Sequence, residues 1–482
     1  MTDSASPDAR APWVLALDAG SSSVRAALYD ARGRPLRPEP LARVPGAWRT
    51  VPDGAMETDA DALFAACVAA LDAGVDAARE AGIRVEAVAM AAFWHGLAGA
   101  AEDGTALTPL YGWGDSRARG AAEALRERVD ARAVHRRTGC FVHESYPAAR
   151  LVWLRGARDD TFPRVSAWVS VGELLLGRLF GRWRTSPSMA SGTGLLDLRA
   201  LTWDAEMLEA VGVSPARLPE VSDEPLRGLR PEWARRWPEL ADTPFFPALG
   251  DGACASLGSG AVGADRLALT VGTSAAARVL GDAAEPEVPD GLWCYRLDAR
   301  RAVWGRALSN AGSAFAWLRR TLALPPREET EAALLAMTPR AHGLTVVPSL
   351  LGERPPLEED AGAAMMRGMT PSTTPLEIAR AWMEAVAERI ARMVAAVEEA
   401  HGRAERVIAS GGALNDSRAF TRMVEDALGR PLHFAADAEA TARGAALLAL
   451  ERIGAIEDAL AFAREGAGGE NPGGTPASGS HG

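Results

Sequence analysis

Lysine is missing from this sequence: all 52 basic residues among its 482 are arginine. Several kinds of site depend on a lysine side chain. A Walker-type phosphate loop and a protein-kinase site each place a lysine on the nucleotide phosphates, and Schiff-base enzymes use its amine. The absence of lysine therefore excludes these three classes of site.

Cysteine is scarce, and the four that occur have no C-x-x-C spacing: Cys67, Cys140, Cys254 and Cys294. We expect buried thiols in a reducing cytoplasm, and neither a disulfide set nor a zinc site. No apolar run approaches the length of a membrane span, and the N-terminus has no basic region followed by an apolar one. These absences predict a soluble, cytoplasmic protein without a membrane partner.

Basic residues are outnumbered by acidic ones, which gives a formal net charge of −11. Proteins that bind nucleic acid need a surplus of basic residues to neutralise phosphates. We therefore expect no nucleic-acid partner. The sequence leaves open whether the chain forms a homodimer.

The length allows two domains with a buried core in each. We expect an N-terminal domain over residues 12–246 and a C-terminal domain over 247–460, with residues 217–246, rich in Pro and Trp, as the hinge. Residues 1–11 and 466–482 consist mainly of small and polar residues, a composition that predicts disordered tails.

One stretch, V-L-A-L-D-A-G-S-S-S-V-R-A-A-L over 14–28, predicts a β-hairpin that binds a metal-bound polyphosphate. Gly20 can take a positive φ and turn the chain tightly. Ser21 and Ser22 leave N–H groups and hydroxyls open to an anion, and Arg25 adds a fork of donors. Asp18 would repel that anion unless a divalent cation lay between them. The alternative is an ordinary hairpin turn.

A second stretch, L-A-L-T-V-G-T-S from Leu267, repeats the first at a constant offset of about half the chain. Gly272 and Thr273 stand where Gly20 and Ser21 stand in the first copy, while Thr270 replaces the acidic residue. The repeat predicts a duplicated domain. Two facing hairpins, only one of which carries a carboxylate, suit a polyphosphate with its metal on one side.

Candidate ligand-binding side chains follow the apolar strand predicted over 85–93. His95 lies in the loop that follows that strand, one residue after Trp94, and strand ends are where α/β domains meet ligands. Trp113, Asp115 and Arg117 share a Gly-punctuated loop, and together they offer a polyhydroxylated ligand an apolar wall, acceptors and donors. The alternatives are a hydrogen-bonded core histidine and an Asp that caps the next helix beside a solvated Arg.

Asp251 lies between two glycines, an uncrowded setting for a carboxylate that accepts the proton of a substrate hydroxyl. Its alternative role is that of a helix N-cap. Farther on, the strand predicted over 406–410 leads into Gly411 and Gly412, and Asn415 follows in the next turn. This junction lets a nucleotide approach the backbone closely, although a tight β–α turn would have the same sequence.

Taken in order, these pieces resemble the FGGY family of carbohydrate kinases over roughly residues 12–460. The matching segments are A-L-D-A-G-S-S-S-V-R, W-G-D-S-R, G-D-G-A-C-A-S-L-G, L-T-V-G-T-S, P-S-L-L-G-E-R-P-P, A-S-G-G-A-L-N and E-A-T-A-R-G-A-A. The resemblance implies an α/β fold with two RNase H-like domains of the actin, hexokinase and sugar-kinase superfamily. It also implies an active site in the cleft between the domains, where ATP and Mg²⁺ support phosphoryl transfer to a sugar or polyol hydroxyl.

The resemblance also assigns roles to residues. Asp251 matches the catalytic base of the family and contacts the substrate, and Asp18 matches the metal-linked carboxylate. Gly20, Ser21, Ser22 and Arg25 match the first phosphate loop, Gly272 and Thr273 the second, and Gly312, Gly411, Gly412 and Asn415 the nucleotide contacts. Ala316 stands where some members keep a glutamine.

Within the family the chain is similar to gluconate kinases, on H-G-L-A-G-A, T-P-L-Y-G-W-G-D-S-R-A, R-R-T-G-C-F-V-H-E-S-Y-P-A-A-R-L-V-W-L and M-A-S-G-T-G-L-L-D-L. We therefore expect D-gluconate as the acceptor, bound by His95, Trp113, Asp115 and Arg117, with Arg117 gripping its carboxylate. A xylulose or ribulose kinase is the alternative within the family. A non-catalytic nucleotide-binding protein and an ATP-driven chaperone or filament are the alternatives outside it.

Overall fold

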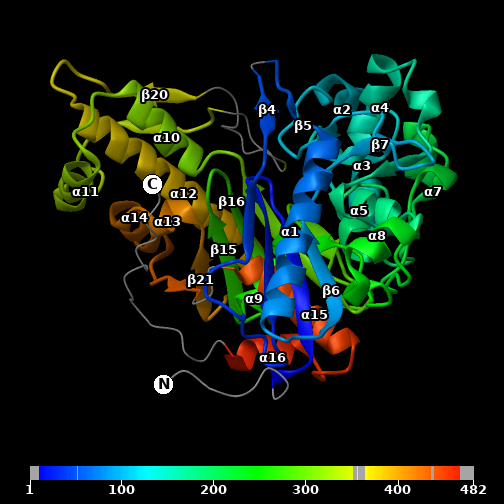
Figure 1. Cartoon of the computed structure of the whole chain (residues 1–482). Helices are drawn as coiled ribbons and strands as arrows, with labels where there is room; N and C mark the ends of the chain where they lie inside the picture. The colour runs from blue at the N-terminus through cyan, green and yellow to red at the C-terminus, as the bar shows by residue number, and fades with distance from the viewer. Residues whose placement is uncertain (1–9, 52, 351–354, 356–363, 436–438, 467–482) are drawn as a thin grey trace.

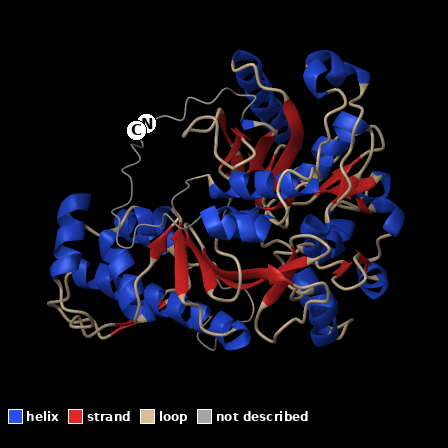
Figure 2. Ribbon diagram, turned by 90° about the horizontal axis from the view of Figure 1, so that it is seen from below, coloured by secondary structure: helices blue, strands red, loops and turns tan. Residues whose placement is uncertain are grey.

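Two β-sheets, each with its own helices, form the framework of the chain in the computed structural model (Figure 1). The structure describes residues 10–51, 53–350, 355, 364–435 and 439–466. Seen from below, the two sheets are separate groups of strands with helices between and around them (Figure 2).

The first sheet is built around β1 (Trp13–Ala19), all of whose residues are buried. Its strand order is β14-β6-β1-β2-β3. β1 pairs antiparallel with β2 (Ser23–Tyr29) and parallel with β6 (Val85–Ala92), while β3 (Ala42–Pro45) and β14 (Leu249–Gly250) form the edges. The predicted hairpin is therefore formed, with Asp18 directly opposite Arg25.

The second sheet repeats this arrangement, in the order β17-β18-β16-β15-β21-β22. β15 (Arg266–Val271) again lies between an antiparallel hairpin partner, β16 (Ala275–Asp282), and a parallel strand, β21 (Arg406–Ser410). β18 (Arg301–Leu308), β17 (Trp293–Arg296) and β22 (His433–Phe434) complete the sheet. The matching topologies agree with the duplication that the repeated hairpin predicts.

Helices cover both sheets, and two of them are long. α1 (Ala60–Glu80) begins after Asp59, which caps it by accepting from the N–H groups of Asp61 and Ala62. α12 (Pro375–His401) begins with a capping box formed by Thr374 and Glu377 and packs on the second sheet.

The remaining elements form smaller groups around these sheets. A lobe on the first domain contains α2 (Arg119–Arg126), α3 (Ala131–Thr138), α4 (Pro147–Ala157), α5 (Val171–Phe180), α6 (Pro187–Ser191), α7 (Ala205–Val211) and α8 (Pro231–Arg236). The second domain adds α10 (Gly312–Thr321), α11 (Arg327–Ala336), α13 (Gly412–Asn415) and α14 (Arg418–Leu428). Short strands are β4 (Trp48–Thr50), β5 (Met56–Thr58), β7 (Ala98–Ala100), β8 (Leu110–Tyr111), β9 (Ala167–Val169), β10 (Arg184–Thr185), β11 (Leu196–Asp197), β12 (Thr202–Trp203), β13 (Glu220–Val221), β19 (Thr345–Val347) and β20 (Met365–Arg367).

Two helices that are far apart in the sequence, α9 (Asp251–Gly258) and α15 (Ala440–Arg452), pack against each other between the sheets. Their backbones touch: a Cβ at Gly444 would lie 1.9 Å from the Cys254 carbonyl oxygen, and one at Gly258 would lie 1.8 Å from that of Ala440. α15 packs on β1, β2 and β6, and α16 (Ala459–Gly466) follows it against α9. The last helices of the chain therefore belong to the core of the first domain.

Residues 217–246 do not form the predicted hinge, because they pack within the first domain. Phe246 N–H donates to the carbonyl of Val88 in β6, and Val88 N–H donates to that of Pro244, at 2.9 and 2.8 Å. The predicted boundary at 246 falls just before β14, which also pairs with β6. Apolar and aromatic side chains in this segment are buried, so its Pro and Trp content reflects packing and not mobility.

The predicted tails fall mostly outside the described residues. Of residues 1–11, Arg10 and Ala11 are described, and Arg10 donates to Asp30 at 2.8 Å. Of residues 466–482, Gly466 is described and ends α16.

A methyl group at the α9–α15 contact should destabilise the protein. Gly444→Ala would place its Cβ inside the Cys254 carbonyl, and overpacking of this kind costs about 1–3 kcal/mol or more. Gly156→Ala is the matched control, because this helical glycine in α4 has no atom within 4 Å of an added Cβ and should gain up to about 1 kcal/mol. Urea unfolding of both variants measures the difference; equal free energies of unfolding would contradict the close contact.

Candidate active site

The first hairpin turns from β1 into β2 through Gly20 and the serines that follow. Gly20 N–H donates to the carbonyl of Ser23 at 3.1 Å. The expectation of a positive φ at Gly20 is wrong, because its φ lies outside the left-handed region. A Cβ there would lie 3.2 Å from the Ser23 oxygen, so the small residue is needed for the tightness of the turn.

Asp18, at the end of β1, is a buried carboxylate with an unusual environment. It forms an ion pair with Arg25, whose other nitrogen pairs with Glu439 at 2.8 Å. Burial raises the pKa of Asp18 from 3.8 to about 7; Arg25 opposes this shift, and the nearby carboxylates of Asp251 and Glu439 add to it. One guanidinium is therefore shared among more negative charge than it can neutralise, which is a favourable setting for a cation.

The second hairpin is held by backbone contacts among the predicted nucleotide-binding glycines. Gly312 N–H donates to the Gly272 carbonyl at 2.9 Å, and a Cβ at Gly312 would lie 2.4 Å from that oxygen. Gly411 has a φ of +102° and would clash with the Val271 carbonyl if it carried a Cβ. These contacts bring Gly272, Gly312 and Gly411 to one place.

The other predicted residues of this group lie around that point. The Thr273 carbonyl accepts from Ser313 N–H at 3.1 Å, and Gly412 and Asn415 begin and end α13. Asn415 is exposed, and its N–H donates to the Gly411 carbonyl at 3.1 Å. Around Gly272 an added Cβ would meet no atom within 4 Å, so the tip of the hairpin leaves its backbone approachable.

Asp251 is the first residue of α9, at the junction with β14, and one of its oxygens accepts from Gly252 N–H at 2.7 Å. The flanking glycines do not leave it uncrowded. A Cβ at Gly250 would lie 1.9 Å from the Trp94 ring, and one at Gly252 would lie 2.8 Å from that ring and 2.9 Å from Nε of Arg278. The glycines therefore make room for an indole and a guanidinium next to the carboxylate.

The two domains enclose a cavity of about 250 Å³ that Asp251 lines. His95, Trp113 and Ser21 also line it, so the structure brings these four predicted residues together. The opposite wall comes from the second domain and consists mainly of Thr270, Ser274, Arg278, Trp293 and Tyr295.

His95 is held firmly at the wall of this cavity. Its φ of 66° lies in the left-handed region, and its Nδ1 is 2.6 Å from the Gly192 carbonyl oxygen. Behind it, the buried Arg150 donates to the carbonyls of His95 and, at 2.7 Å, Ser145. Burial lowers the pKa of Arg150 to about 10, so the guanidinium is charged at neutral pH.

Asp115 and Arg117 do not line the cavity. Arg117 pairs with Asp115 and with Glu57, at 2.6 Å each, and its guanidinium lies 4.8 Å from the ring centroid of Trp153. Burial alone would lower the pKa of Arg117, but its bonds to both carboxylates raise it. Asp115 also accepts from Met56 N–H at 3.1 Å and does not cap α2, which begins after Ala118 without a side-chain cap.

Several residues of the wall were not predicted. Trp94, Trp293 and Tyr295 form an aromatic cluster in which the last two rings stack at 4.5 Å, and Tyr146 reaches Tyr295 through their hydroxyls at 2.7 Å. The position of Arg278 could have been noticed, because it is the basic residue of the repeated hairpin. Trp293 and Tyr295 have no comparable signal, because they reach the cavity from a strand that the repeat does not include.

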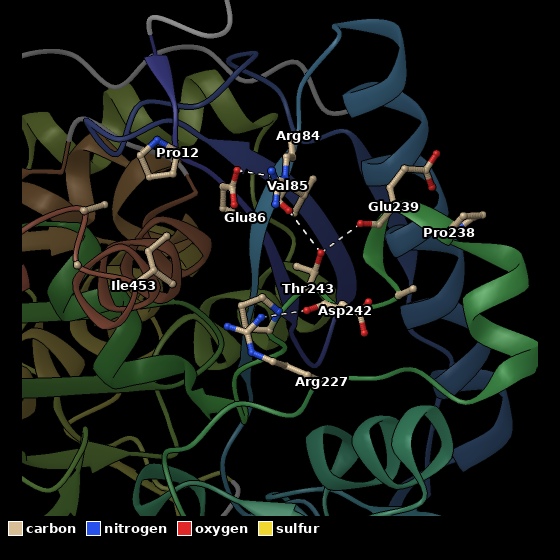
Figure 3. A pocket seen from close by; sticks show the side chains of 14 residues that line it. Pro12, Arg84, Val85, Glu86, Arg227, Pro238, Glu239, Asp242, Thr243 and Ile453 are labelled. Atoms are coloured by element: carbon tan, nitrogen blue, oxygen red, sulfur yellow. Dashed lines mark hydrogen bonds and ion pairs between the residues drawn. The ribbon is translucent and has the colours of Figure 1, made fainter.

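A larger cavity, of about 610 Å³, lies at the other end of the first sheet (Figure 3). It is lined by Pro12, which precedes β1, by Arg84 and Glu86 at the start of β6, and by Thr243. These are the amino ends of the parallel strands, opposite the carboxyl ends that carry Asp18 and His95. It contains none of the predicted site residues, and α/β sheets bind their ligands at the carboxyl ends.

Two domain models of one protein family, the FGGY family of carbohydrate kinases, match the chain. The FGGY N-terminal domain matches residues 13–258, and the FGGY C-terminal domain matches residues 267–451. The chain belongs to the FGGY family of carbohydrate kinases. It is therefore a phosphotransferase that acts on an alcohol group of a carbohydrate.

Individual relatives point to more than one acceptor. A gluconokinase of Bacillus subtilis (strain 168) is 25% identical over 460 residues, which cover 92% of this chain and 88% of that protein. The crystal structures of a gluconate kinase and of a ligand-bound xylulose kinase, both from Lactobacillus acidophilus, each match with a TM-score of 0.85 at 23% identity. Each match covers 95% of this chain and 92% of the other, so these two matches establish the fold and leave the acceptor undecided.

Within the described residues, no group of three or more His, Cys, Asp or Glu side chains could hold a metal ion by itself. Among the same residues, no helix is long and apolar enough to cross a membrane.

The titration of Asp18 should be visible in the stability of the metal-free protein. The pKa of Asp18 is about 7 in the folded state and 3.8 in the unfolded state, so between these values the folded state binds the extra proton. The free energy of unfolding of the wild type therefore falls as the pH rises from 3.8 through 7. Asp18→Asn removes this loss. Urea unfolding in EDTA at pH 5 and pH 8 should show the variant gaining on the wild type with rising pH, by at most about 1.4 kcal/mol per pH unit. Parallel pH profiles would contradict the raised pKa.

Proposed function

We propose that the chain is an ATP-dependent kinase that transfers the γ-phosphoryl group to D-gluconate, which gives 6-phosphogluconate. The observation that carries the phosphoryl transfer is the position of Asp251, which lines a cavity between the two domains that bear the hairpins. At this position a base can contact the hydroxyl of an acceptor bound to the first domain, while the second domain binds the phosphoryl donor.

The reaction follows from this placement. The acceptor hydroxyl gives its proton to Asp251 as its oxygen attacks the γ-phosphorus. Gly20, Ser21, Ser22 and Arg25 bind phosphate oxygens from the first domain, and Gly272 and Thr273 from the second. Gly312, Gly411, Gly412 and Asn415 hold the nucleotide. Backbone donors at two facing turns suit a group whose charge is spread over several oxygens.

Asp18 would hold Mg²⁺ in this proposal. It fits, because its buried carboxylate lies among the negative charges of Asp251 and Glu439, which one guanidinium only partly offsets. Mg²⁺ is usually held by one or two carboxylates together with phosphates and waters, so a site without three protein ligands is the expected kind. When bound, the ion neutralises the phosphate charge that Asp18 would otherwise repel.

The acceptor pocket favours an acid over a neutral sugar. The buried guanidinium of Arg150 bonds to the carbonyls of His95 and Ser145, both of which line the cavity. Arg150 bonds to carbonyls and not to a carboxylate in the described residues, and the charges of Asp115 and Glu144 act on it only from a distance, so part of its positive potential reaches that wall. His95 and Trp113 contact the acceptor in this proposal, and the relatives named as gluconate kinases support it.

Asp115 and Arg117 take part in one of two ways. Arg117 grips the carboxylate directly if it exchanges Asp115 or Glu57 for the acceptor; otherwise the pair supports the loop that carries Trp113. The alternative acceptors are xylulose and ribulose, for which Arg117 would stay with its two carboxylates.

Asp251→Asn should abolish transfer while ATP binding survives, because the amide cannot accept the hydroxyl proton. We expect kcat to fall on the order of a hundredfold or more. Asp265→Asn is the control: this half-buried carboxylate pairs with Arg464 at 2.6 Å, does not line the cavity, and should leave kcat within about twofold. ADP release and calorimetric titration with an ATP analogue measure both properties, and near-wild-type turnover would remove Asp251 from its role.

Wild type should prefer gluconate to xylulose, ribulose and glycerol in kcat/KM. If Arg117 grips the carboxylate, Arg117→Ala loses that preference; Arg119→Ala, an exposed arginine two positions on, keeps it. Retained preference in Arg117→Ala assigns acid recognition to the field of Arg150 instead. A neutral sugar that outperforms gluconate on the wild type would overturn the choice of acceptor.

A further inference from the structure

Arg278 is a charged side chain in the cavity to which neither the sequence nor the resemblance assigns a role. It belongs to β16, the outgoing strand of the second hairpin, and lines the cavity together with Thr270, Ser274 and Ala276. In the register of the sheet it lies opposite Gly305, which in turn lies opposite Trp293. A Cβ at Gly305 would lie 2.6 Å from the Trp293 ring, so this row forms one continuous part of the wall.

The guanidinium of Arg278 lies between the two halves of the site. Its NH1 donates to the Thr270 hydroxyl at 3.1 Å, two residues before Gly272 of the second phosphate hairpin. Its Nε faces the backbone of Gly252, where an added Cβ would lie 2.9 Å away, and Gly252 directly follows Asp251. One side chain of the second domain therefore extends from the phosphate hairpin to the residue next to Asp251.

Thr270 helps to hold the guanidinium of Arg278 in this position, because its hydroxyl accepts from that group. It stands where the first hairpin has Asp18, and the carboxylate there holds Arg25 in an ion pair. In the second hairpin a hydroxyl takes that place and accepts from Arg278, and the Thr270 hydroxyl lies 3.1 Å from that of Ser410. The acid-to-hydroxyl change between the copies therefore gives this arginine a neutral partner at Thr270.

We propose that Arg278 is a catalytic residue that stabilises the phosphoryl group during its transfer. The inference rests on the proposed kinase reaction. As the acceptor oxygen bonds to the γ-phosphorus, the bond from that phosphorus to the bridging oxygen breaks, ADP keeps the electron pair, and the hydroxyl proton passes to Asp251. Arg278 neither gains nor loses a proton; its guanidinium bonds to the equatorial oxygens, where charge accumulates.

The position of Arg278 favours this role over recognition of the acceptor carboxylate. The hydroxyl that reacts lies at Asp251, and the carboxylate of gluconate is at the opposite end of a six-carbon chain. A guanidinium packed against the residue next to the base is therefore at the reacting end. The chain has no lysine to supply a cation there.

The test compares Arg278→Ala and Arg278→Lys with wild type in steady-state kinetics. Each is measured with the acceptor that the wild type turns over fastest, so failure of gluconate as acceptor leaves this test intact. We expect kcat of Arg278→Ala to fall about a thousandfold, with both KM values within about threefold. Arg278→Lys should recover part of the loss, as should guanidinium ions added to Arg278→Ala.

Arg266→Ala is the matched control, an arginine of the neighbouring strand that donates to the Gly260 carbonyl at 3.2 Å and should keep kcat. Titration with an ATP analogue verifies that Arg278→Ala is folded. An unchanged kcat overturns the inference, as does a rise of acceptor KM with kcat retained, which would make Arg278 a binding residue. Absence of transfer by the wild type to every acceptor overturns both the proposed function and this inference.

Discussion

The contact between α9 and α15 is the constraint on which the site depends. Gly258 and Gly444 let the two helix backbones touch, and α15 packs in turn on the strands of the first hairpin. α9 begins at Asp251, and Glu439 immediately precedes α15, so the same contact places both carboxylates near Asp18. A side chain at either glycine would separate the helices and with them the charges of the site.

The electrostatics of the site follow from this crowding of acids. Burial and two neighbouring carboxylates hold the pKa of Asp18 near 7, although Arg25 pairs with it directly. Such an arrangement is costly in the empty protein and becomes favourable when a cation and phosphates arrive. The first domain therefore contributes concentrated negative charge, and the second contributes open backbone donors and Arg278.

The domains are also tied together at one edge of the cavity. β17 of the second sheet bonds to the first domain through Tyr295 and Tyr146 at 2.7 Å and through Cys294 N–H and the Gly139 carbonyl at 3.0 Å. Nearby, His135 is 2.8 Å from the Leu292 carbonyl oxygen. These bonds hold the domains together along this edge, so closure on a ligand would pivot about it and bring together the hairpins on the other side.

The sequence by itself determined the repeated hairpin and the strands that lead to His95 and Gly411, because each depends on local periodicity and turn residues. In both sheets the repeated hairpin also has a parallel strand beside it, whereas the outer strands differ between the copies. Asp251, His95 and Trp113 could be chosen from their neighbours in the chain, since strand ends and glycine-flanked turns are local features.

Tertiary structure alone decided what surrounds them. Arg117 is drawn to Glu57 and Asp115, Gly250 and Gly252 make room for Trp94, and residues 217–246 pack on β6. The wall formed by Trp293, Tyr295 and Arg278 exists because the two domains face each other, and a contact between segments far apart in the chain leaves no local pattern from which to predict it.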